Sequence, residues 1–228
     1  MPPTERPTSA WAAPWPRRSS MTHTLHRVGD PTQLSEDFVI LMMPSKDINH
    51  QGSGPKLQRM MRLCLENGAI EVGDARLGNE HHQGGRETMI DNIEDRAVIQ
   101  AVFDNEADLT RALKALKEAD EGISVVVSGL FDRVRECCQE VGLTPHTVNQ
   151  SLGRWGRTEK LPDDARLELN TMCGHGMVAL GLIDETIEQV KKGEMTPEQA
   201  GKRLFKPCQC GIFNTHRAAR IVGALAGG

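Results

Sequence analysis

Phe38-Val39-Ile40-Leu41-Met42-Met43 is an uninterrupted apolar run that ends at Pro44. A short continuous apolar run bounded by a proline predicts a strand that is buried on both faces. A polar loop over residues 45–55 follows, and a helix is expected to begin near Lys56. The apolar face of that helix has i, i+3, i+4, i+7 and i+8 spacing and consists of Leu57, Met60, Met61, Cys64 and Leu65. A short strand over residues 69–72 completes a strand–helix–strand unit.

A second unit of the same kind follows the first. A strand is expected over residues 97–103, a helix over 106–119 and another strand over 123–127, after a polar segment at 73–95. Ser128 can cap a further helix, whose buried side is predicted to consist of Leu130, Phe131, Val134, Cys137, Cys138 and Val141. The order of elements, roughly βαβ–βαβ–α, predicts an α/β (α+β) fold. It fits a ferredoxin-like split βαβ sandwich or a small doubly wound sheet, and the pattern does not separate the two.

The composition divides the chain into four parts. Residues 1–30 are expected to be a disordered tail or an overlong start, and residues 31–142 an α/β domain. Residues 143–171 are polar and turn-rich and predict a connector, with one strand at 167–169. Residues 172–228 are predicted to form a helical region that carries a cysteine cluster.

Three helices are predicted in this last region. The first covers residues 178–192. The second begins after the segment Thr196-Pro197-Glu198-Gln199, which has the pattern of a capping box with proline at the first helical position. Asn214 is expected to cap the last helix, over residues 215–225. A hairpin of the first two helices returns the chain on itself and is expected to bring the cysteines before and after it together.

The composition is that of an ordinary globular protein, with 38% hydrophobic and 25% charged residues. The formal net charge of −4 gives no electrostatic reason to expect nucleic acid as a partner. No apolar run approaches the roughly 20 residues that a membrane-spanning helix requires. Six cysteines without a visible secretory signal predict a cytoplasmic protein, in which clustered thiols serve a metal or catalysis rather than disulfides.

Three of the six cysteines lie in two short glycine-containing motifs. The first reads Thr171-Met172-Cys173-Gly174-His175-Gly176-Met177, and the second reads Lys206-Pro207-Cys208-Gln209-Cys210-Gly211. Soft thiolates among residues with little or no side chain suit a metal ion or an iron–sulfur cluster, which requires close approach of the backbone. The other cysteines, Cys64, Cys137 and Cys138, are expected in the core.

Three thiolates permit two kinds of metal centre. In one, Cys173, Cys208 and Cys210 hold a [4Fe-4S] cluster whose fourth iron stays open to a substrate. In the other, a zinc ion takes the same three thiolates plus His175. The proline before and the glycine after the Cys-x-Cys pair favour the crowded surroundings of a cluster, whereas the spacing itself is unusual for both. Inert packing and a redox dithiol or nucleophile are the remaining interpretations.

Roughly residues 125–222 resemble an uncharacterised family of bacterial and archaeal proteins. The resemblance is carried by Cys173-Gly174-His175-Gly176-Met177 and Pro207-Cys208-Gln209-Cys210-Gly211-Ile212-Phe213-Asn214. It implies no activity. In ligand chemistry alone, the three-thiol set is similar to those of cluster-dependent dehydratases and desulfidases, from which no residue role is carried over.

These patterns predict an iron–sulfur enzyme of the lyase type, a hydro-lyase or a desulfidase. It would bind a small polar molecule at the open iron and act by elimination, hydration or desulfuration. His175 is the candidate proton donor or acceptor, and His50 is the candidate from the N-terminal domain. A carrier or regulator of a metal or cluster is one alternative, and a zinc-stapled structural module is another. The oligomeric state is not indicated.

Three further polar features have structural interpretations beside functional ones. Gly52-Ser53-Gly54-Pro55-Lys56 suits an anion-binding turn between a strand and a helix, or a plain turn. His81 and His82 lie in a polar loop, either at the rim of an active site or in solvent. A third set, which would bind an anionic substrate or cover the sheet, consists of Arg154, Arg157 and Lys160 around Trp155, with Asn149, Gln150 and Ser151 before them.

Overall fold

The computed structural model describes residues 27–150 and 153–227. Its centre is a sheet of five strands: β1 (Phe38–Met43), β2 (Glu71–Asp74), β3 (Gly78–Asn79), β4 (Ile99–Phe103) and β5 (Ser124–Ser128). The strand order is β3-β2-β4-β1-β5, and each neighbouring pair is antiparallel. The fold is therefore mixed α/β, as expected. The alternative of a doubly wound sheet is wrong, because that arrangement requires mostly parallel strands.

The apolar run at 38–43 is β1, which has a neighbouring strand on each side. Ile40 is paired with Ala101 of β4 and with Val127 of β5. Ile40 and Met42 belong to one hydrophobic core, whereas Val39 belongs to a second core on the opposite face. Because both faces of β1 are covered, its sequence shows no alternation of apolar and polar residues.

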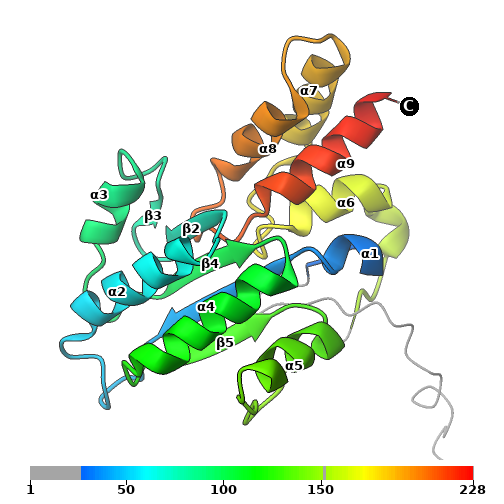
Figure 1. Cartoon of the computed structure of the whole chain (residues 1–228). Helices are drawn as coiled ribbons and strands as arrows, with labels where there is room; N and C mark the ends of the chain where they lie inside the picture. The colour runs from blue at the N-terminus through cyan, green and yellow to red at the C-terminus, as the bar shows by residue number, and fades with distance from the viewer. Residues whose placement is uncertain (1–26, 151–152, 228) are drawn as a thin grey trace, which may run out of the picture.

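One face of the sheet is covered by the helices that follow β1, β4 and β5. They are α2 (Ser53–Glu66), α4 (Glu106–Ala119) and α5 (Phe131–Glu140), which lie together in front of the sheet in Figure 1. A short helix, α3 (Arg86–Asp91), and strand β3 form within the segment 73–95, where no element was predicted.

The starts of α4 and α5 differ in how they are capped. Asn105 accepts the backbone N–H of Asp108 at 2.8 Å, and α4 has the predicted bounds. α5 begins after Leu130 without a side-chain cap. The prediction that Ser128 caps this helix is wrong, because Ser128 is the last residue of β5 and is paired with Val39.

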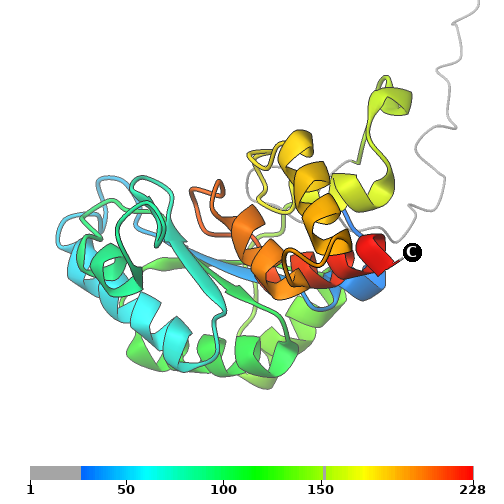
Figure 2. The same cartoon turned by 90° about the horizontal axis from the view of Figure 1, so that it is seen from above.

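The C-terminal helices lie on the opposite face of the sheet, above it in Figure 2. They are α6 (Asp164–Thr171), α7 (Leu180–Lys191), α8 (Pro197–Phe205) and α9 (Thr215–Gly227). Their apolar side chains share one core with Val39 and Val102 of the sheet. The cysteine-bearing region therefore packs directly on the sheet. Within residues 27–150 and 153–227, no helix is long and apolar enough to cross a membrane.

Side-chain caps place the starts of these helices. Thr196 and Gln199 form the predicted capping box of α8, and Asn214 Oδ1 accepts the N–H of Arg217 at 2.8 Å at the start of α9. The predicted strand at 167–169 is wrong. Those residues lie in α6, because the Asp163 side chain caps its first turn. The expected connector therefore ends in a helix, and it also contains a short 3₁₀ helix, η1 (Thr158–Lys160).

Residues 27–30 belong to the folded part of the chain. Arg27 is only 1% exposed, and α1 (Pro31–Leu34) follows directly and leads to β1. The backbone N–H of Val28 donates to Thr171 Oγ1 at 3.1 Å, which joins this segment to α6. The expectation of a tail over residues 1–30 is therefore wrong for 27–30, and residues 1–26 lie outside the described part.

Candidate functional site

The structure brings Cys173, Cys208, Cys210 and His175 together, and we call these four residues the thiol centre. Cys173 lies just after α6, and the two other cysteines lie in the turn between α8 and α9. Cys210 Sγ is 3.4 Å from His175 Nδ1 and 3.8 Å from the backbone oxygen of Cys173. The Cys208 thiol donates a hydrogen bond to Cys210. Two segments more than 30 residues apart therefore converge, as the sequence predicts.

All three cysteines of the thiol centre are buried. Cys173 and Cys208 have no exposed surface, and Cys210 is 5% exposed. They pack in the core between the sheet and the C-terminal helices. Burial of three thiols at one place separates them from bulk water and makes their charges sensitive to close neighbours.

The loop that carries the second motif lies directly against strand β2. Gly211 has a φ of +80°, and a Cβ atom built on it would lie 2.5 Å from the backbone nitrogen of Gly73. A Cβ atom on Gly73 would lie 2.5 Å from the backbone oxygen of Cys210. Both positions require glycine because the two backbones touch. The glycine after the Cys-x-Cys pair therefore serves the approach of this loop to the sheet.

Two polar side chains of the sheet hold this loop by its carbonyl groups. Asn79 is fully buried, and its Nδ2 donates to the backbone oxygen of Cys208 at 2.8 Å. Gln100, with its amide oriented so that nitrogen faces the loop, donates to the backbone oxygen of Cys210 at 2.7 Å. Sequence reasoning missed both residues. The available signal was a glutamine in the otherwise apolar strand Ile99–Phe103.

The thiols of Cys208 and Cys210 have pKa values shifted in opposite directions. The hydrogen bond from Cys208, the Ile212 backbone and the nearby His175 together lower the pKa of Cys210 to about 6, against the opposing effect of burial. Burial, together with the charges of Cys210 and Cys173, raises the pKa of Cys208 well above its ordinary value. Near neutral pH, Cys210 is therefore a thiolate and Cys208 is its hydrogen-bond donor.

The sulfur of Cys173 lies against backbone amides. It accepts the N–H of Met177 at 3.1 Å and the N–H of His175 at 3.4 Å. Gly174 and Gly176 have φ values of +72° and +66°, which fold this turn around the sulfur. The same sulfur lies 3.6 Å from the backbone oxygen of Asn170, to which its thiol can donate.

The thiol centre offers three sulfurs and one imidazole, which are donor atoms that suit a soft metal ion. In the described part of the chain, however, no three His, Cys, Asp or Glu side chains are already arranged as a metal site. Cys208 is the hydrogen-bond donor of the Cys208–Cys210 pair and therefore carries a proton. Binding of a metal would therefore release the Cys208 proton and replace that hydrogen bond.

The structure does not place His50 at the thiol centre. His50 lies in the loop between β1 and α2. Its Nδ1 accepts the N–H of Asp47 at 2.7 Å, and its Nε2 lies 3.2 Å from an Arg96 guanidinium nitrogen. These contacts assign it to the loop that precedes α2.

The remaining cysteines are core residues, as predicted. Cys64, Cys137 and Cys138 are at most 5% exposed and belong to the core between the sheet and the first helices. Burial raises the pKa of Cys64 to about 12, and it also raises the pKa values of Cys137 and Cys138. These thiols are therefore protonated near neutral pH.

The turn at 52–56 already holds an anion of its own chain. The backbone N–H groups of Gly52 and Gly54 donate to the Asp95 carboxylate at 2.8 and 2.7 Å. This internal carboxylate occupies the place that a bound phosphate would take. The structure therefore favours the plain-turn interpretation of the segment.

Other candidate residues lie beside the site or away from it. The ring of His81 meets Phe205 edge-to-face at 5.6 Å, and His82 Nδ1 accepts the N–H of Asn79 at 3.3 Å. Both histidines lie in the loop that follows β3. Arg154 forms an ion pair with Asp164, and Trp155 is 78% exposed. Ser151 lies outside the described residues.

Comparison with known proteins adds no assignment. No family model matches the chain, no curated protein matches it, and no solved structure matches it. The resemblance of the two cysteine motifs to an uncharacterised bacterial and archaeal family therefore stays a prediction. Function has to be argued from the thiol centre alone.

Proposed function

We propose that Cys173, Cys208 and Cys210 hold a [4Fe-4S] cluster in a cytoplasmic enzyme of the lyase type. The observation that carries the proposal is the convergence of three buried cysteines, from segments on either side of the α7–α8 hairpin, beside one histidine. Three thiolates match a cluster with one iron that has no cysteine ligand. When bound, the cluster would supply a Lewis acid at that open iron.

The chain's own residues support the negative charge of such a centre. The Cys173 sulfur accepts two backbone amides, and Cys210 is a thiolate near neutral pH. Cys208 has to lose its proton before it can bind a metal. Because its pKa is raised, the thiol stays protonated until a metal displaces the proton. Loading should therefore release a proton and become weaker as the pH falls.

His175 is the group that we propose to move a proton. Its Nδ1 lies 3.4 Å from Cys210 Sγ and 3.1 Å from the backbone oxygen of Cys173. An imidazole in this position can donate to, or accept from, a small polar substrate that reaches the thiol centre. Elimination, hydration and desulfuration each need such a proton transfer.

We also infer that β1, β2, β4 and β5 with α2 and α4 form a ferredoxin-like split βαβ arrangement. In the strand order β2-β4-β1-β5, α2 joins two strands that flank β4, and α4 joins two strands that flank β1. Two such interleaved crossovers are the feature that defines this arrangement. In this interpretation, the C-terminal helices cover the sheet face that α2 and α4 leave open.

Two alternatives each have one favourable observation. The position of His175 beside Cys210 favours a zinc ion with three sulfurs and one imidazole. A carrier or regulator is the second alternative, and for it the groove of about 410 Å³ between α8 and α9, away from the three cysteines, offers a place for a partner. A substrate pocket would instead be expected to include the thiol centre.

The test is to purify cysteine variants anaerobically and to measure bound iron, sulfide and zinc per chain. We expect Cys173→Ala, Cys208→Ala and Cys210→Ala each to lose the bound metal. Cys138→Ala is the matched control, because Cys138 is a buried cysteine of the other core. Retention of iron and sulfide in all three site variants would refute the proposal, and loss of zinc alone would support the structural zinc module.

A further inference from the structure

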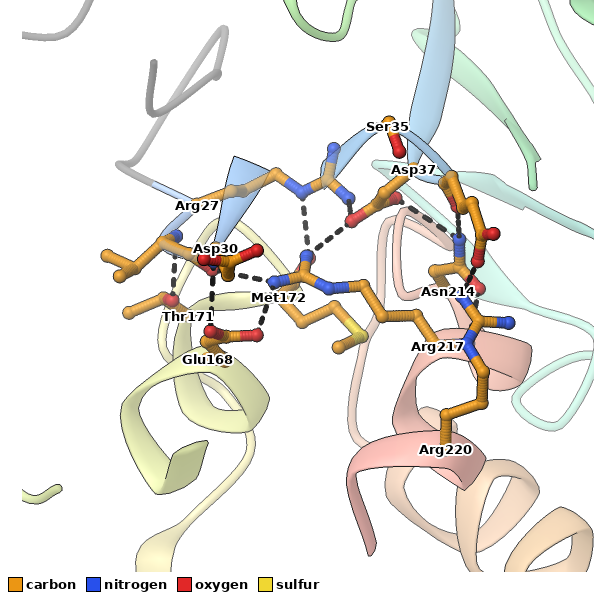
Figure 3. A network of polar contacts seen from close by, with 12 residues as sticks. Arg27, Asp30, Ser35, Asp37, Glu168, Thr171, Met172, Asn214, Arg217 and Arg220 are labelled. Atoms are coloured by element: carbon orange, nitrogen blue, oxygen red, sulfur yellow. Dashed lines mark hydrogen bonds and ion pairs between the residues drawn. The ribbon is translucent and has the colours of Figure 1, made fainter. Parts of the chain in front are cut away.

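A buried charged network joins the two segments that carry the thiol centre, and Figure 3 shows it from close by. Its charged members, which we call the arginine clamp, are Arg27, Asp37, Glu168 and Arg217. The side chains of Asp37 and Arg217 have no exposed surface, and that of Arg27 is 2% exposed. The Glu168 side chain is 11% exposed, so the clamp is buried at its centre and reaches the surface only at this residue.

The centre of the clamp is the Asp37 carboxylate, which both arginines approach. Arg217 donates to Asp37 Oδ2 at 2.6 Å, and Arg27 forms an ion pair with the same oxygen. Arg217 also donates to Glu168 Oε2 at 2.9 Å. Two positive and two negative groups balance in formal charge, although Arg27 Nη2 and Arg217 Nε have no hydrogen-bond partner within the described part of the chain.

One arm of the clamp reaches the residue that precedes Cys173. Arg27 Nε donates to the backbone oxygen of Met172 at 3.2 Å. The neighbouring N–H of Val28 donates to Thr171 Oγ1 at 3.1 Å. The turn that places the Cys173 sulfur therefore starts from a backbone that the N-terminal segment holds in place.

The other arm reaches the segment that follows Cys210. Asn214 Nδ2 donates to the backbone oxygen of Glu36 at 2.9 Å, and Asn214 Oδ1 accepts the N–H of Arg217 at 2.8 Å. Asn214 is four residues after Cys210. Arg217 also donates to the backbone oxygen of Val28 at 2.8 Å, so both arms meet at the same segment.

We propose that Arg27, through the arginine clamp, is a positioning residue of the thiol centre. It holds the turn that carries Cys173 in register with the loop that carries Cys208 and Cys210. As far as it concerns metal loading, the inference rests on the proposed function. It assigns a role to the segment at 27–30, which sequence reasoning had placed in a tail.

The test compares Arg27→Met with Arg59→Met, using Co²⁺ as the probe of the thiol centre. Met keeps an unbranched apolar stem in place of the arginine stem and removes the charge and the donors. Arg59 is the matched control because its ion pair with Glu121 lies at the surface of α2, on the other side of the sheet. We expect Arg27→Met to weaken Co²⁺ binding by about 10-fold to 100-fold and to change the sulfur-to-cobalt absorption, with Arg59→Met unchanged.

Metal-free protein supplies an independent readout, the rate at which iodoacetamide alkylates each cysteine, measured by mass spectrometry. Arg27→Met should accelerate alkylation of Cys173 and Cys210 about tenfold or more, but not that of Cys138 in the other core. Should Arg27→Met fail to fold, Thr171→Val tests the same arm, since it removes only the hydroxyl that Val28 contacts. Leu113→Ala, a large-to-small change in the first core, controls for general destabilisation.

The outcomes separate the two proposals. Selective acceleration at Cys173 and Cys210 in a chain that binds no metal would support the clamp and contradict the cluster. Unchanged Co²⁺ affinity and unchanged alkylation rates in folded Arg27→Met or Thr171→Val would overturn the clamp, whatever metal the wild type holds. Equal acceleration at all cysteines, as in Leu113→Ala, would also overturn it.

Discussion

His175 Nδ1 lies 3.4 Å from Cys210 Sγ, although the two residues belong to different turns on opposite sides of a helical hairpin. The contact joins an imidazole to a thiol whose pKa is lowered to about 6. Cys208 completes the arrangement, because its thiol keeps its proton and donates a hydrogen bond to Cys210, while its own pKa is raised. One sulfur of the Cys-x-Cys pair is therefore charged, and the other is neutral near neutral pH.

The pH dependence of Cys210 follows from these neighbours. In metal-free protein, alkylation of Cys210 by iodoacetamide should rise with pH, with a midpoint near 6. Cys208→Ala and His175→Ala should each move the midpoint upward, because each removes a group that stabilises the thiolate. Mass spectrometry of the modified cysteines across pH 4–10 measures this, with Cys64 as the unreactive reference. A midpoint near the ordinary thiol value in the wild type would contradict the assignment.

Gly211→Ala should destabilise the protein strongly. The φ of +80° costs an alanine about 1–2 kcal/mol, and the contact of its Cβ with β2 adds about 1–3 kcal/mol. Gly193→Ala is the matched control, because Gly193 has a φ of +72° and open space around the built Cβ. It should cost only about 1–2 kcal/mol. Urea unfolding compares the two, and equal losses would argue against the close approach of the cysteine loop to β2.

Asn79→Ala should destabilise the fold and loosen the turn that carries Cys208. The change leaves the backbone oxygens of Cys208 and Phe205 without this donor, at a cost of about 1–3 kcal/mol. Asn92→Ala, at an exposed position, should cost clearly less. Hydrogen exchange of the amides at 208–211 should accelerate in the first variant alone. Exchange at native rates would show that Asn79 does not hold this loop.

Asp37 should contribute to an acid-induced loss of stability. Burial alone would raise its pKa, but the charges of Arg27 and Arg217 outweigh burial and lower the pKa below its ordinary value. The stabilisation is therefore present above the unfolded-state pKa of about 3.9 and is lost as the pH falls through the lower folded-state value. Asp37→Asn should cost about 3–5 kcal/mol at pH 7, since it leaves buried arginines uncompensated.

The corresponding measurement is the free energy of unfolding between pH 2 and 7. The difference between wild type and Asp37→Asn should be constant near neutral pH and shrink at the acid end. A difference that persists unchanged at pH 2 would mean that the carboxylate charge is not what stabilises the clamp.

Much of the local structure could be predicted from the sequence. The bounds of α4 and the capping box of α8 follow from residues that are close together in the sequence, so a local pattern is enough to predict them. The misassigned strand at 167–169 shows the limit, because Leu167, Glu168 and Leu169 alternate like a strand. The Asp163 cap just before them favours the helix that forms.

The pairing of strands and the surroundings of the thiols could not be predicted in the same way. The antiparallel order depends on contacts between residues far apart in the chain, which a local pattern does not encode. The meeting of Cys173 with Cys210 was expected because the hairpin returns the chain. Asn79 and Arg27 were missed because each acts through backbone groups of a distant segment. The expectation for His50 was wrong because the sequence does not show where the thiol centre lies relative to the loop after β1.

The most direct test of the central claim is the amount of iron, acid-labile sulfide and zinc in the wild-type chain after anaerobic purification, together with its visible spectrum. The account predicts about four irons and four sulfides per chain, with broad absorption that bleaches on reduction. One zinc without sulfide, or no metal at all, would contradict the iron–sulfur assignment.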